Sequence, residues 1–284
     1  SYTSLAFDSS ANPAISYYDA TNDDLKYAHW NVTEWAIETV DSQGDVGQYT
    51  SLAFDSLDNP AISYHDATNG DLKYAQRNGV SWDITTVDDS DWIGSYTSLA
   101  FDSSDNPAIS YYNATKGDLK YAHWDGTDWQ IQTLDSEGDV GLYTSLALDS
   151  SGNPAISYYD VSNDDLKYAH WDGAEWDIET VCSIGDVGRY TSLAFDGWGD
   201  PAISYYDLRH GDLKYAHRMD MSWVIETVDS GGDDDVGRYT SLAFDSLGNP
   251  AISYYDVSNG NLKYAHWNGI SWDIESVDSL GDVG

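Results

Sequence analysis

The sequence has little positive charge, a single cysteine and no long apolar run. Its 12 Lys and Arg residues face 49 Asp and Glu residues, which gives a formal net charge of −37. Binding to nucleic acid or to an anionic membrane surface depends on Lys and Arg, so neither partner is expected. No segment approaches the roughly 18 consecutive apolar residues of a spanning helix, which predicts no membrane insertion. Cys182 is the only cysteine, so an internal disulfide is excluded.

What the sequence does contain is one motif repeated six times. The segment YTSLA begins at Tyr2, Tyr49, Tyr96, Tyr143, Tyr190 and Tyr239, at intervals of 47 residues and, for the last, 49. All 6 prolines and half of the 12 tryptophans fall into single columns of this repeat. We expect a single domain over residues 1–284 with units at 2–48, 49–95, 96–142, 143–189, 190–238 and 239–284, Ser1 completing the last loop.

Each repeat contains four short segments typical of β-strands. In the fourth repeat these are YTSLALD, AISYYD, LKYAHW and WDIETV, separated by turns rich in Asp, Asn, Gly and Ser. No segment holds helical periodicity long enough to form a helix. The pattern predicts an all-β fold, a six-bladed β-propeller with four antiparallel strands per blade. An open solenoid is the alternative, but both faces of the strands carry bulky side chains, as blades covered on both sides require.

The two ends of the sequence match the junctions between repeats. The last residues, SLGDVG, joined to the first, SYTSLAFD, read like the segment GDVGQYTSLAFD around Tyr49. We therefore expect whole blades, closed without a shared (velcro) blade, with Gly284 and Ser1 within a loop's reach of each other. The missing initiator Met predicts a chain processed or excised from a longer one.

Two known kinds of repeat resemble this motif. SLALDSSGNPAISYYDVSNDDLKYA is similar to the first three strands of NHL-type propeller repeats. WDGAEW resembles a degenerate Asp-box hairpin of sialidase-like and lectin propellers. Both resemblances imply that the first strand of each blade is innermost and the fourth outermost. Because the motifs are short, they imply the fold rather than an activity.

Aspartate outnumbers glutamate 42 to 7, and most aspartates stand beside turns. Asp can accept hydrogen bonds from the N–H groups of its own turn, so we interpret the excess mainly as turn chemistry, with salt adaptation as a second explanation. Six of the seven lysines form a column at the start of the third strand. There we expect an ion pair with the Asp that ends the second strand.

Candidate metal ligands come from the loop that joins one repeat to the next. They are Asp45, Asp139, Asp186, Asp235 and Asp282. Carboxylates beside a flexible glycine suit calcium, but the spacing of a dedicated calcium loop is missing, and a solvated loop is the simpler interpretation. The third-strand histidines (His29, His123, His170, His217 and His266) are expected to be hydrogen-bonded packing residues. We expect no cofactor, with calcium as the open alternative.

The candidate ligand-binding residues stand before the hairpin that joins the third and fourth strands. They are Trp30, Arg77, Trp124, Trp171, Arg218 and Trp267. Sugars bind proteins by stacking on Trp or Tyr while Asp, Asn or Arg take the hydroxyl groups, and these repeats offer both. Packing between blades is the alternative for this column, and it is our interpretation of the invariant tryptophan column that begins at Trp35.

We expect a non-catalytic, extracellular or cell-surface binding module. Near-identical repeats distribute like residues over the fold, whereas a catalytic site needs unlike residues in one place, so no enzyme is predicted. The main hypothesis is multivalent, lectin-like binding of carbohydrate, or of a partner protein, through equivalent sites. The alternatives are a structural or adhesion unit of a larger extracellular or filamentous assembly and, behind it, a calcium-dependent hydrolase. Glycosylation sequons occur at Asn31 and Asn113.

Overall fold

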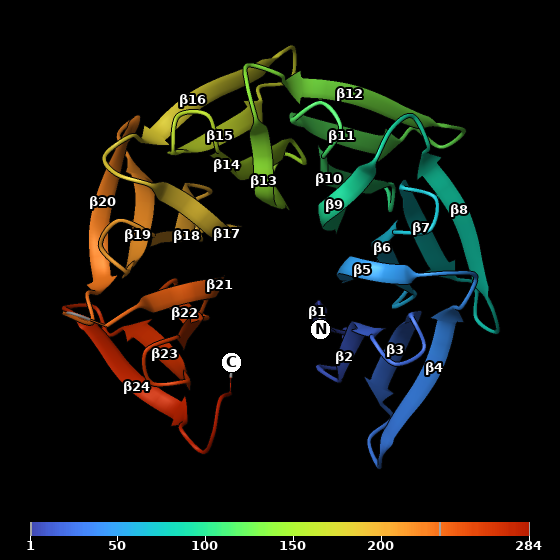
Figure 1. The fold of residues 1–284 in the computed structure, drawn as a ribbon, viewed down its shortest axis with the longest axis horizontal. Coiled ribbons are helices and arrows are strands. Elements are labelled where there is room, and N and C mark those ends of the chain that lie inside the picture. The colour runs from blue at the N-terminus through green and yellow to red at the C-terminus, as the bar shows by residue number, and fades with distance from the viewer. Residues whose placement is uncertain (1, 233, 284) are drawn as a thin grey trace. The chain divides into compact units, whose positions relative to one another are not determined.

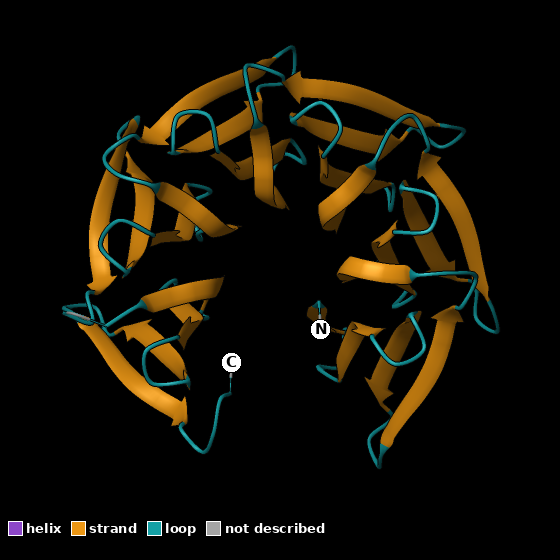
Figure 2. Cartoon of the chain, viewed as in Figure 1, coloured by secondary structure: helices purple, strands orange, loops and turns teal. Residues whose placement is uncertain are grey.

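The computed structural model describes residues 2–232 and 234–283. The chain divides into two compact units, residues 1–141 and 142–284, and each unit contains three repeats. The described residues form strands and loops only, with no helix among them (Figure 2). This agrees with the lack of helical periodicity in the sequence.

Each repeat of the first unit forms four strands. The first repeat forms β1 (Thr3–Phe7), β2 (Pro13–Asp19), β3 (Asp24–Trp30) and β4 (Trp35–Asp41). The second forms β5 (Val46–Phe54), β6 (Pro60–Asp66), β7 (Asp71–Arg77) and β8 (Trp82–Asp88). The third forms β9 (Ile93–Phe101), β10 (Pro107–Asn113), β11 (Asp118–Trp124) and β12 (Trp129–Asp135).

The second unit follows the same plan. The fourth repeat forms β13 (Val140–Leu148), β14 (Pro154–Asp160), β15 (Asp165–Trp171) and β16 (Trp176–Cys182). The fifth forms β17 (Val187–Phe195), β18 (Pro201–Asp207), β19 (Asp212–Met219) and β20 (Ser222–Asp229). The sixth forms β21 (Val236–Phe244), β22 (Pro250–Asp256), β23 (Asn261–Trp267) and β24 (Trp272–Asp278).

Each sheet contains the four strands of one repeat in sequence order. In the second repeat, for example, the antiparallel order is β5-β6-β7-β8 (Figure 1). Six such sheets make the chain an all-β, six-bladed β-propeller, as predicted. Each described sheet consists of four strands that are consecutive in the chain, which agrees with the expectation that no blade is shared. The first strands from β5 onward begin before the repeat boundary, at Val46 rather than Tyr49 in the case of β5. Ser1 and Gly284, on which the expectation about the chain ends depends, lie outside the described residues.

The first strand is the inner strand of each blade. Within the units, β1 contacts β5, β5 contacts β9, and β17 contacts β21. Hydrogen bonds join these strands directly: the Leu52 N–H donates to Ser4 Oγ at 3.0 Å, and the Leu99 N–H donates to Ser51 Oγ at 3.0 Å. The contacts of the first strands confirm the strand order that the repeat resemblances implied.

Aspartates at the ends of the first strands cap their own turns. Asp8 Oδ1 accepts from the N–H groups of Ser10 (3.0 Å) and Asn12 (2.8 Å), and Asp8 Oδ2 accepts from Asn12 Nδ2 (2.9 Å). Each turn leads into a strand whose first residue is proline, because no ladder hydrogen bond is needed from that N–H. The same Asp–Asn capping recurs at Asp55, Asp102, Asp149 and Asp245. The aspartate excess is therefore turn chemistry at these positions, as interpreted.

The first strands begin with an irregular segment that brings neighbouring blades together. The pairing of β5 with β6 shifts between Gln48 and Ser51, a β-bulge in which Tyr49 has a φ of 52°. Gly47 just before it has a φ of +104°, and a Cβ at this position would lie 2.8 Å from Leu25 Cα of the preceding blade. Glycine is required here both by the φ angle and by the close approach.

The hydrophobic core lies between neighbouring blades. The cluster between blades 1 and 2 includes Leu25, Tyr27, Ile62 and Tyr64, all buried. All seven residues of β6 are buried, as expected for a strand covered on both faces. The tryptophan at the start of the fourth strand packs against each cluster, as interpreted from the sequence: Trp82, Trp129, Trp223 and Trp272.

Three of these interfaces also contain a buried or half-buried carboxylate that a tyrosine and a lysine share. The Tyr64 hydroxyl donates to Asp41 Oδ2 at 2.7 Å, and Lys73 Nζ lies 3.4 Å from the same oxygen. Lys73 Nζ also lies 3.0 Å from Asp66 at the end of β6, which confirms the ion pair expected within the hairpin. The same Tyr–Asp–Lys arrangement joins Tyr111, Asp88 and Lys120, and also Tyr254, Asp229 and Lys263.

Candidate functional site

A pocket of about 350 Å³ lies between blades 1 and 2. Trp30, the last residue of β3, and Arg77, the last residue of β7, both line it, together with Tyr27 and His29. Turn and loop residues complete the polar lining: Asp8, Asn12, Asp58 and Asn59. Two of the candidate residues, from different repeats, therefore share one pocket, with an aromatic wall beside several hydrogen-bonding groups.

Arg77 is held at the pocket by a glutamate of the neighbouring blade. Its Nη1 lies 2.8 Å from Glu38 Oε1, and both side chains are about a quarter exposed, at 25% and 29%. The Trp82 indole Nε1 donates to Glu38 Oε2 at 3.3 Å. The Trp82 ring also stands edge-on to Tyr27 of blade 1, with ring centroids 5.2 Å apart. Glu38 thus holds the Arg77 guanidinium and the Trp82 indole at the cleft between blades 1 and 2.

The cleft between blades 4 and 5 repeats this arrangement. Arg218 Nη1 lies 2.8 Å from Glu179 Oε1, and Trp223 Nε1 donates to the same oxygen at 3.1 Å. The Arg218 guanidinium lies 5.8 Å from the Trp223 ring centroid, a cation–π contact. Trp171 occupies the position in blade 4 that Trp30 occupies in blade 1.

The other two clefts within the units lack the Arg–Glu pair. Between blades 2 and 3, Thr85 stands where Glu38 stands in blade 1, and Trp124 stands in the arginine column. Between blades 5 and 6, Glu226 accepts from the indole Nε1 of Trp272 at 3.2 Å, but the arginine column holds Trp267. Glu and Arg therefore occur together in two of the four clefts.

Each tryptophan of the candidate column packs edge-on against the tryptophan that begins the next strand of its own blade. The ring centroids are 5.7–6.0 Å apart in the pairs Trp30–Trp35, Trp124–Trp129, Trp171–Trp176 and Trp267–Trp272. All four side chains stay partly exposed. They pack within the blade and still present aromatic surface at the hairpin.

Charge and protonation in the pocket follow from its hydrogen bonds. Burial raises the pKa of Tyr27 to about 12, against the opposing effect of the Arg77 charge, so Tyr27 keeps its proton. Hydrogen bonds from Asn12 lower the pKa of Asp8, which is therefore an acceptor at neutral pH. His29 Nδ1 is buried without a hydrogen-bond partner among the described residues and lies 4.0 Å from Glu38 Oε1. The pocket thus offers donors and acceptors beside an aromatic wall.

Two other third-strand histidines bond to the turn aspartate of their own blade. The distance is 3.3 Å from His170 Nε2 to Asp149 Oδ2 and 3.2 Å from His266 Nε2 to Asp245 Oδ2. These two are hydrogen-bonded residues of the kind that the sequence predicted.

The calcium candidates are already engaged by hydrogen-bond donors. Asp45 accepts from the Tyr18 hydroxyl at 2.9 Å and from Gln48 Nε2 at 3.1 Å. Tyrosine hydroxyls of the preceding blade likewise donate to Asp139, Asp186, Asp235 and Asp282. The loop carboxylates therefore join blades through tyrosine, a role that the sequence did not reveal.

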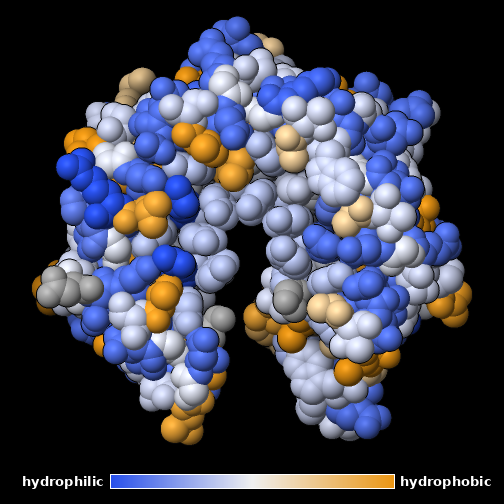
Figure 3. Space-filling view, in the orientation of Figure 1, coloured by the Kyte–Doolittle hydropathy of each residue, from blue (hydrophilic) through white to orange (hydrophobic). Residues whose placement is uncertain are grey.

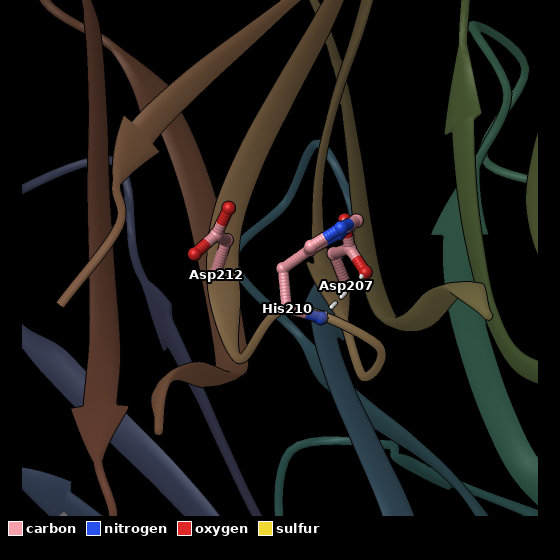
Figure 4. Close-up of side chains that lie close together, drawn as sticks. All are labelled: Asp207, His210 and Asp212. Carbon is pink, nitrogen blue, oxygen red and sulfur yellow. Dashed lines mark hydrogen bonds and ion pairs between the residues drawn. The ribbon is translucent and has the colours of Figure 1, made fainter. Parts of the chain in front are cut away.

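Within the described ranges, the one group of three close metal-ligating side chains is Asp207, His210 and Asp212 (Figure 4). His210 Nδ1 lies 2.8 Å from Asp207 Oδ2. In other repeats an asparagine, such as Asn69, donates to the equivalent aspartate from the same turn position. Lys214 Nζ lies 3.1 Å from Asp212 and 3.8 Å from Asp207 and already forms an ion pair with each. We therefore assign this cluster to the hairpin turn rather than to a metal.

The surface carries apolar side chains mostly one at a time. The face shown in Figure 3 is largely hydrophilic, with small separate apolar spots. The most exposed large apolar side chains stand in turns: Val80, Trp198, Met221, Leu247, Ile270 and Leu280. In the described part of the chain, no helix is long and apolar enough to cross a membrane.

No family model and no curated protein matches the sequence. Solved structures with the same fold include a lectin of Aleuria aurantia in complex with Fucalpha1-6GlcNAc, with a TM-score of 0.64 and 12% identity over 98% of this chain and 95% of that chain. The SapL1 lectin in complex with alpha methyl fucoside has a TM-score of 0.61 and 14% identity over 97% and 96% of the two chains.

The fold of this chain is similar to that of an enzyme as well. The ulvan lyase of polysaccharide lyase family PL25 has a TM-score of 0.69 and 13% identity over 96% of this chain and 82% of that chain. At these identities the likeness establishes the fold alone. Proteins of this fold thus include lectins and a polysaccharide lyase, so the function of this chain has to be argued from its own clefts.

Proposed function

We propose that this chain is a non-catalytic, lectin-like carbohydrate-binding module that acts at or outside the cell surface. Its binding sites are the cleft between blades 1 and 2, with Glu38, Arg77 and Trp30, and the equivalent cleft with Glu179 and Arg218. The observation that carries the proposal is the selective presence of the Arg–Glu pair in two clefts whose packing does not require it.

Clefts with and without the pair have the same aromatic packing. The edge-on contact of Tyr27 with Trp82 has ring centroids 5.2 Å apart, and that of Tyr74 with Trp129 has 5.4 Å, although only the first cleft has Arg and Glu. A partly exposed ion pair adds about 1 kcal/mol or less to stability. A guanidinium and a carboxylate fixed side by side, next to an indole, suit the adjacent hydroxyl groups and the apolar face of a pyranose.

Charge favours neutral over acidic sugars as ligands. The charge of Arg77 is already balanced by Glu38 at 2.8 Å. The net charge of −37 repels uronic, sialic and sulfated saccharides. We therefore propose neutral glycans with an exposed apolar ring face as the ligand class.

The carboxylates of the pocket support binding rather than catalysis. Glycosidases use two carboxylates with different protonation states, one on each side of the scissile bond. Asp58 accepts from the Ser9 hydroxyl (2.6 Å) and backbone N–H (2.8 Å), and Asp8 caps its own turn. With Glu38 in its ion pair, each acidic group near the pocket already has a structural partner.

The test is a glycan array that contains neutral and acidic saccharides, followed by calorimetric titration of the best neutral ligand into the folded chain. We expect about two sites per chain, one for each Arg–Glu pair. Arg77→Met and Arg218→Met should each remove one site, and the double variant should bind nothing. Lys116→Met is the matched control, because it removes a positive charge paired with Asp91 elsewhere in the first unit and should leave both sites intact.

Three outcomes would contradict the proposal. Silence on the array, or binding that survives in the double variant, would favour a structural or adhesion role. Release of shortened products from a bound polysaccharide, detected by mass spectrometry, would show an enzyme instead.

A further inference from the structure

The interface between blades 4 and 5 lacks the shared carboxylate of the other three interfaces within the units. Cys182, at the end of β16, takes the position that Asp41 holds at the end of β4. The Tyr205 hydroxyl, which corresponds to that of Tyr64, has no hydrogen-bond partner among the described residues, and Tyr205 is 0% exposed. A fully buried hydroxyl donor without an acceptor is costly and therefore rare.

The corresponding lysine has found other partners. Lys214 Nζ donates to Thr227 Oγ1 at 2.6 Å and lies 3.1 Å from Asp212. By contrast, Lys120 and Lys263 each contact the aspartate that ends the preceding blade. The donors built to surround a carboxylate are therefore still present at this interface, while the carboxylate is gone.

Cys182 lies beside the unpartnered hydroxyl. Both residues belong to the same buried cluster between the blades. Burial raises the pKa of Tyr205, and the neighbouring Cys182 adds to that shift through its charge and as a weak acceptor, although its sulfur makes no hydrogen bond of normal geometry to the hydroxyl. A cysteine side chain extends one heavy atom beyond Cβ, whereas aspartate extends three, so the two oxygen positions next to Tyr205 have no protein oxygen from Cys182.

We propose that Cys182 is a peroxide-dependent modification site whose sulfinic acid form takes the place of the missing carboxylate. A cysteine sulfinate, Cβ–SO₂⁻, has the same number of heavy atoms as the aspartate carboxylate, two acceptor oxygens and one negative charge. The Tyr205 hydroxyl then donates to one oxygen, and the ammonium group of Lys214 turns to the other. Sulfenic acid provides one oxygen only, and a sulfonate has one too many for the site.

The reaction needs two molecules of hydrogen peroxide. In the first step the thiolate sulfur attacks a peroxide oxygen: the S–O bond forms, the O–O bond breaks, and hydroxide leaves, so the sulfur loses two electrons and the peroxide gains them. In the second step the sulfenic sulfur attacks another peroxide in the same way and releases water and a proton to solvent. The product is the sulfinate, a four-electron oxidation in total.

Cys182 is buried, but it is the last residue of the fourth strand and 9% of the residue is exposed. An oxidant as small as hydrogen peroxide would reach the sulfur through this exposed part. The oxidised state is favoured afterwards because it satisfies a donor that the thiol leaves unpaired. The interface thus becomes more stable on oxidation, the reverse of the damage that oxidation usually causes in a core.

The experiment treats the full, folded chain with hydrogen peroxide and follows it by peptide mass spectrometry and thermal unfolding. The peptide that contains Cys182 should gain about 32 Da, two oxygen atoms, and no more. The midpoint of unfolding should rise by about 2–4 °C. Cys182→Asp should show a similar rise without peroxide.

The controls separate this site from the methionines. Met219 and Met221 are exposed, at 54% and 87%. Their oxidation to sulfoxides also adds oxygen atoms to the mass of the whole chain. Cys182→Ala carries both methionines, so its response to peroxide measures their effect on the unfolding midpoint alone. The rise in the wild-type chain should exceed that response, and Cys182→Asp should show no further rise.

The proposal is overturned by any of three results. The thiol stays reduced under conditions that convert both methionines, or oxidation proceeds to the sulfonic acid without a sulfinate plateau, or the sulfinate form unfolds at a lower temperature than the thiol form. None of these results measures glycan binding, which is tested separately with the Arg77 and Arg218 variants.

Discussion

The cleft between blades 1 and 2 and the cleft between blades 2 and 3 share their packing. In the first, Trp82 stands edge-on to Tyr27 at 5.2 Å and 70°. In the second, Trp129 stands edge-on to Tyr74 at 5.4 Å and 70°. Both tryptophans pack against the buried cluster of their interface. The apolar part of the interface is thus the same in both places.

The polar groups of the two clefts differ as a pair. Glu38 and Arg77 are replaced by Thr85 and Trp124 at the same register positions, opposite Tyr and Trp of the neighbouring strands. Since the packing is unchanged, the pair is not what holds the blades together. If the pair binds a glycan, as proposed, stability and recognition are carried by different residues of the same strands. Four experiments test that separation.

The largest effect is expected from the shared packing. Trp82→Ala and Trp129→Ala should each lower the free energy of unfolding by about 2–4 kcal/mol, because each removes a large side chain from an interface cluster. Denaturant unfolding of the two variants measures this. A clear difference between the two losses would show that the Arg–Glu pair contributes to packing after all.

A smaller effect, and one confined to binding, is expected at Glu38. Glu38→Gln keeps the shape but removes the charge that fixes Arg77 at 2.8 Å. The affinity of that cleft for a neutral glycan should fall about tenfold, as for loss of a charged hydrogen bond. The free energy of unfolding should change by less than about 1 kcal/mol. If calorimetric titration gives Glu38→Gln the same glycan affinity as the parent chain, Glu38 takes no part in glycan binding.

The comparison can also be reversed. Thr85→Glu combined with Trp124→Arg places the pair in the cleft that lacks it, and the number of glycan sites should rise by one. Stability should stay within about 1 kcal/mol of the parent, since a partly exposed ion pair contributes little. If the number of glycan sites per chain is unchanged although the variant folds, binding also requires the loop residues of the first cleft.

The smallest effect concerns the buried end of the interface between blades 2 and 3. Burial alone would raise the pKa of Asp88, but hydrogen bonds from Lys120, Ser90 and Tyr111 hold it below the usual value of 3.8. A lowered pKa stabilises the folded chain above the unfolded-state value, and this stabilisation is lost as the pH falls through the folded-state value. Asp88→Asn should therefore make unfolding less dependent on pH below about 4. Glycan binding at pH 7 should be unchanged. Weaker binding would show that the buried end of the interface, at Asp88, is coupled to the cleft.

Most of the fold follows from the repeat itself. The period, the four strands and the proline that begins each second strand are local features, visible in one repeat and multiplied six times. Trp30 and Arg77 were also predicted as members of one column. Their convergence on one pocket was not predictable from the column, because the pocket is made by two successive blades.

Partners across an interface are what the sequence conceals. Glu38 precedes Arg77 by 39 residues, and Glu226 occupies its column before a repeat with no arginine. The available signal was that each arginine of this column, Arg77 or Arg218, follows a repeat with Glu in that position. Such a spacing predicts a contact only when the register of the strands is known.

The sequence also did not reveal that a pair of aromatic rings replaces a Tyr–Asp hydrogen bond at one interface. Where the other repeats pair a tyrosine with an aspartate, the interface between blades 2 and 3 has His65 and Trp92, whose rings are 5.4 Å apart at 61°. His65 Nδ1 also lies 2.6 Å from the Ile93 carbonyl oxygen. In the sequence these were two unrelated irregularities, and in the structure they are one exchange of a hydrogen bond for an aromatic contact.

The completion of every sheet within one repeat has a genetic consequence. An in-frame duplication or loss of one 47-residue period leaves the remaining strand ladders whole, because each described sheet consists of four strands that are consecutive in the chain. Recombination between such similar gene segments is therefore tolerated at the level of secondary structure, and selection acts on how blades fit and on which clefts they create. A Glu in one repeat and an Arg in the next can arise by mutation independently, and unequal crossing-over can then copy the two adjacent repeats together. The pairs Glu38–Arg77 and Glu179–Arg218 each join one repeat to the next.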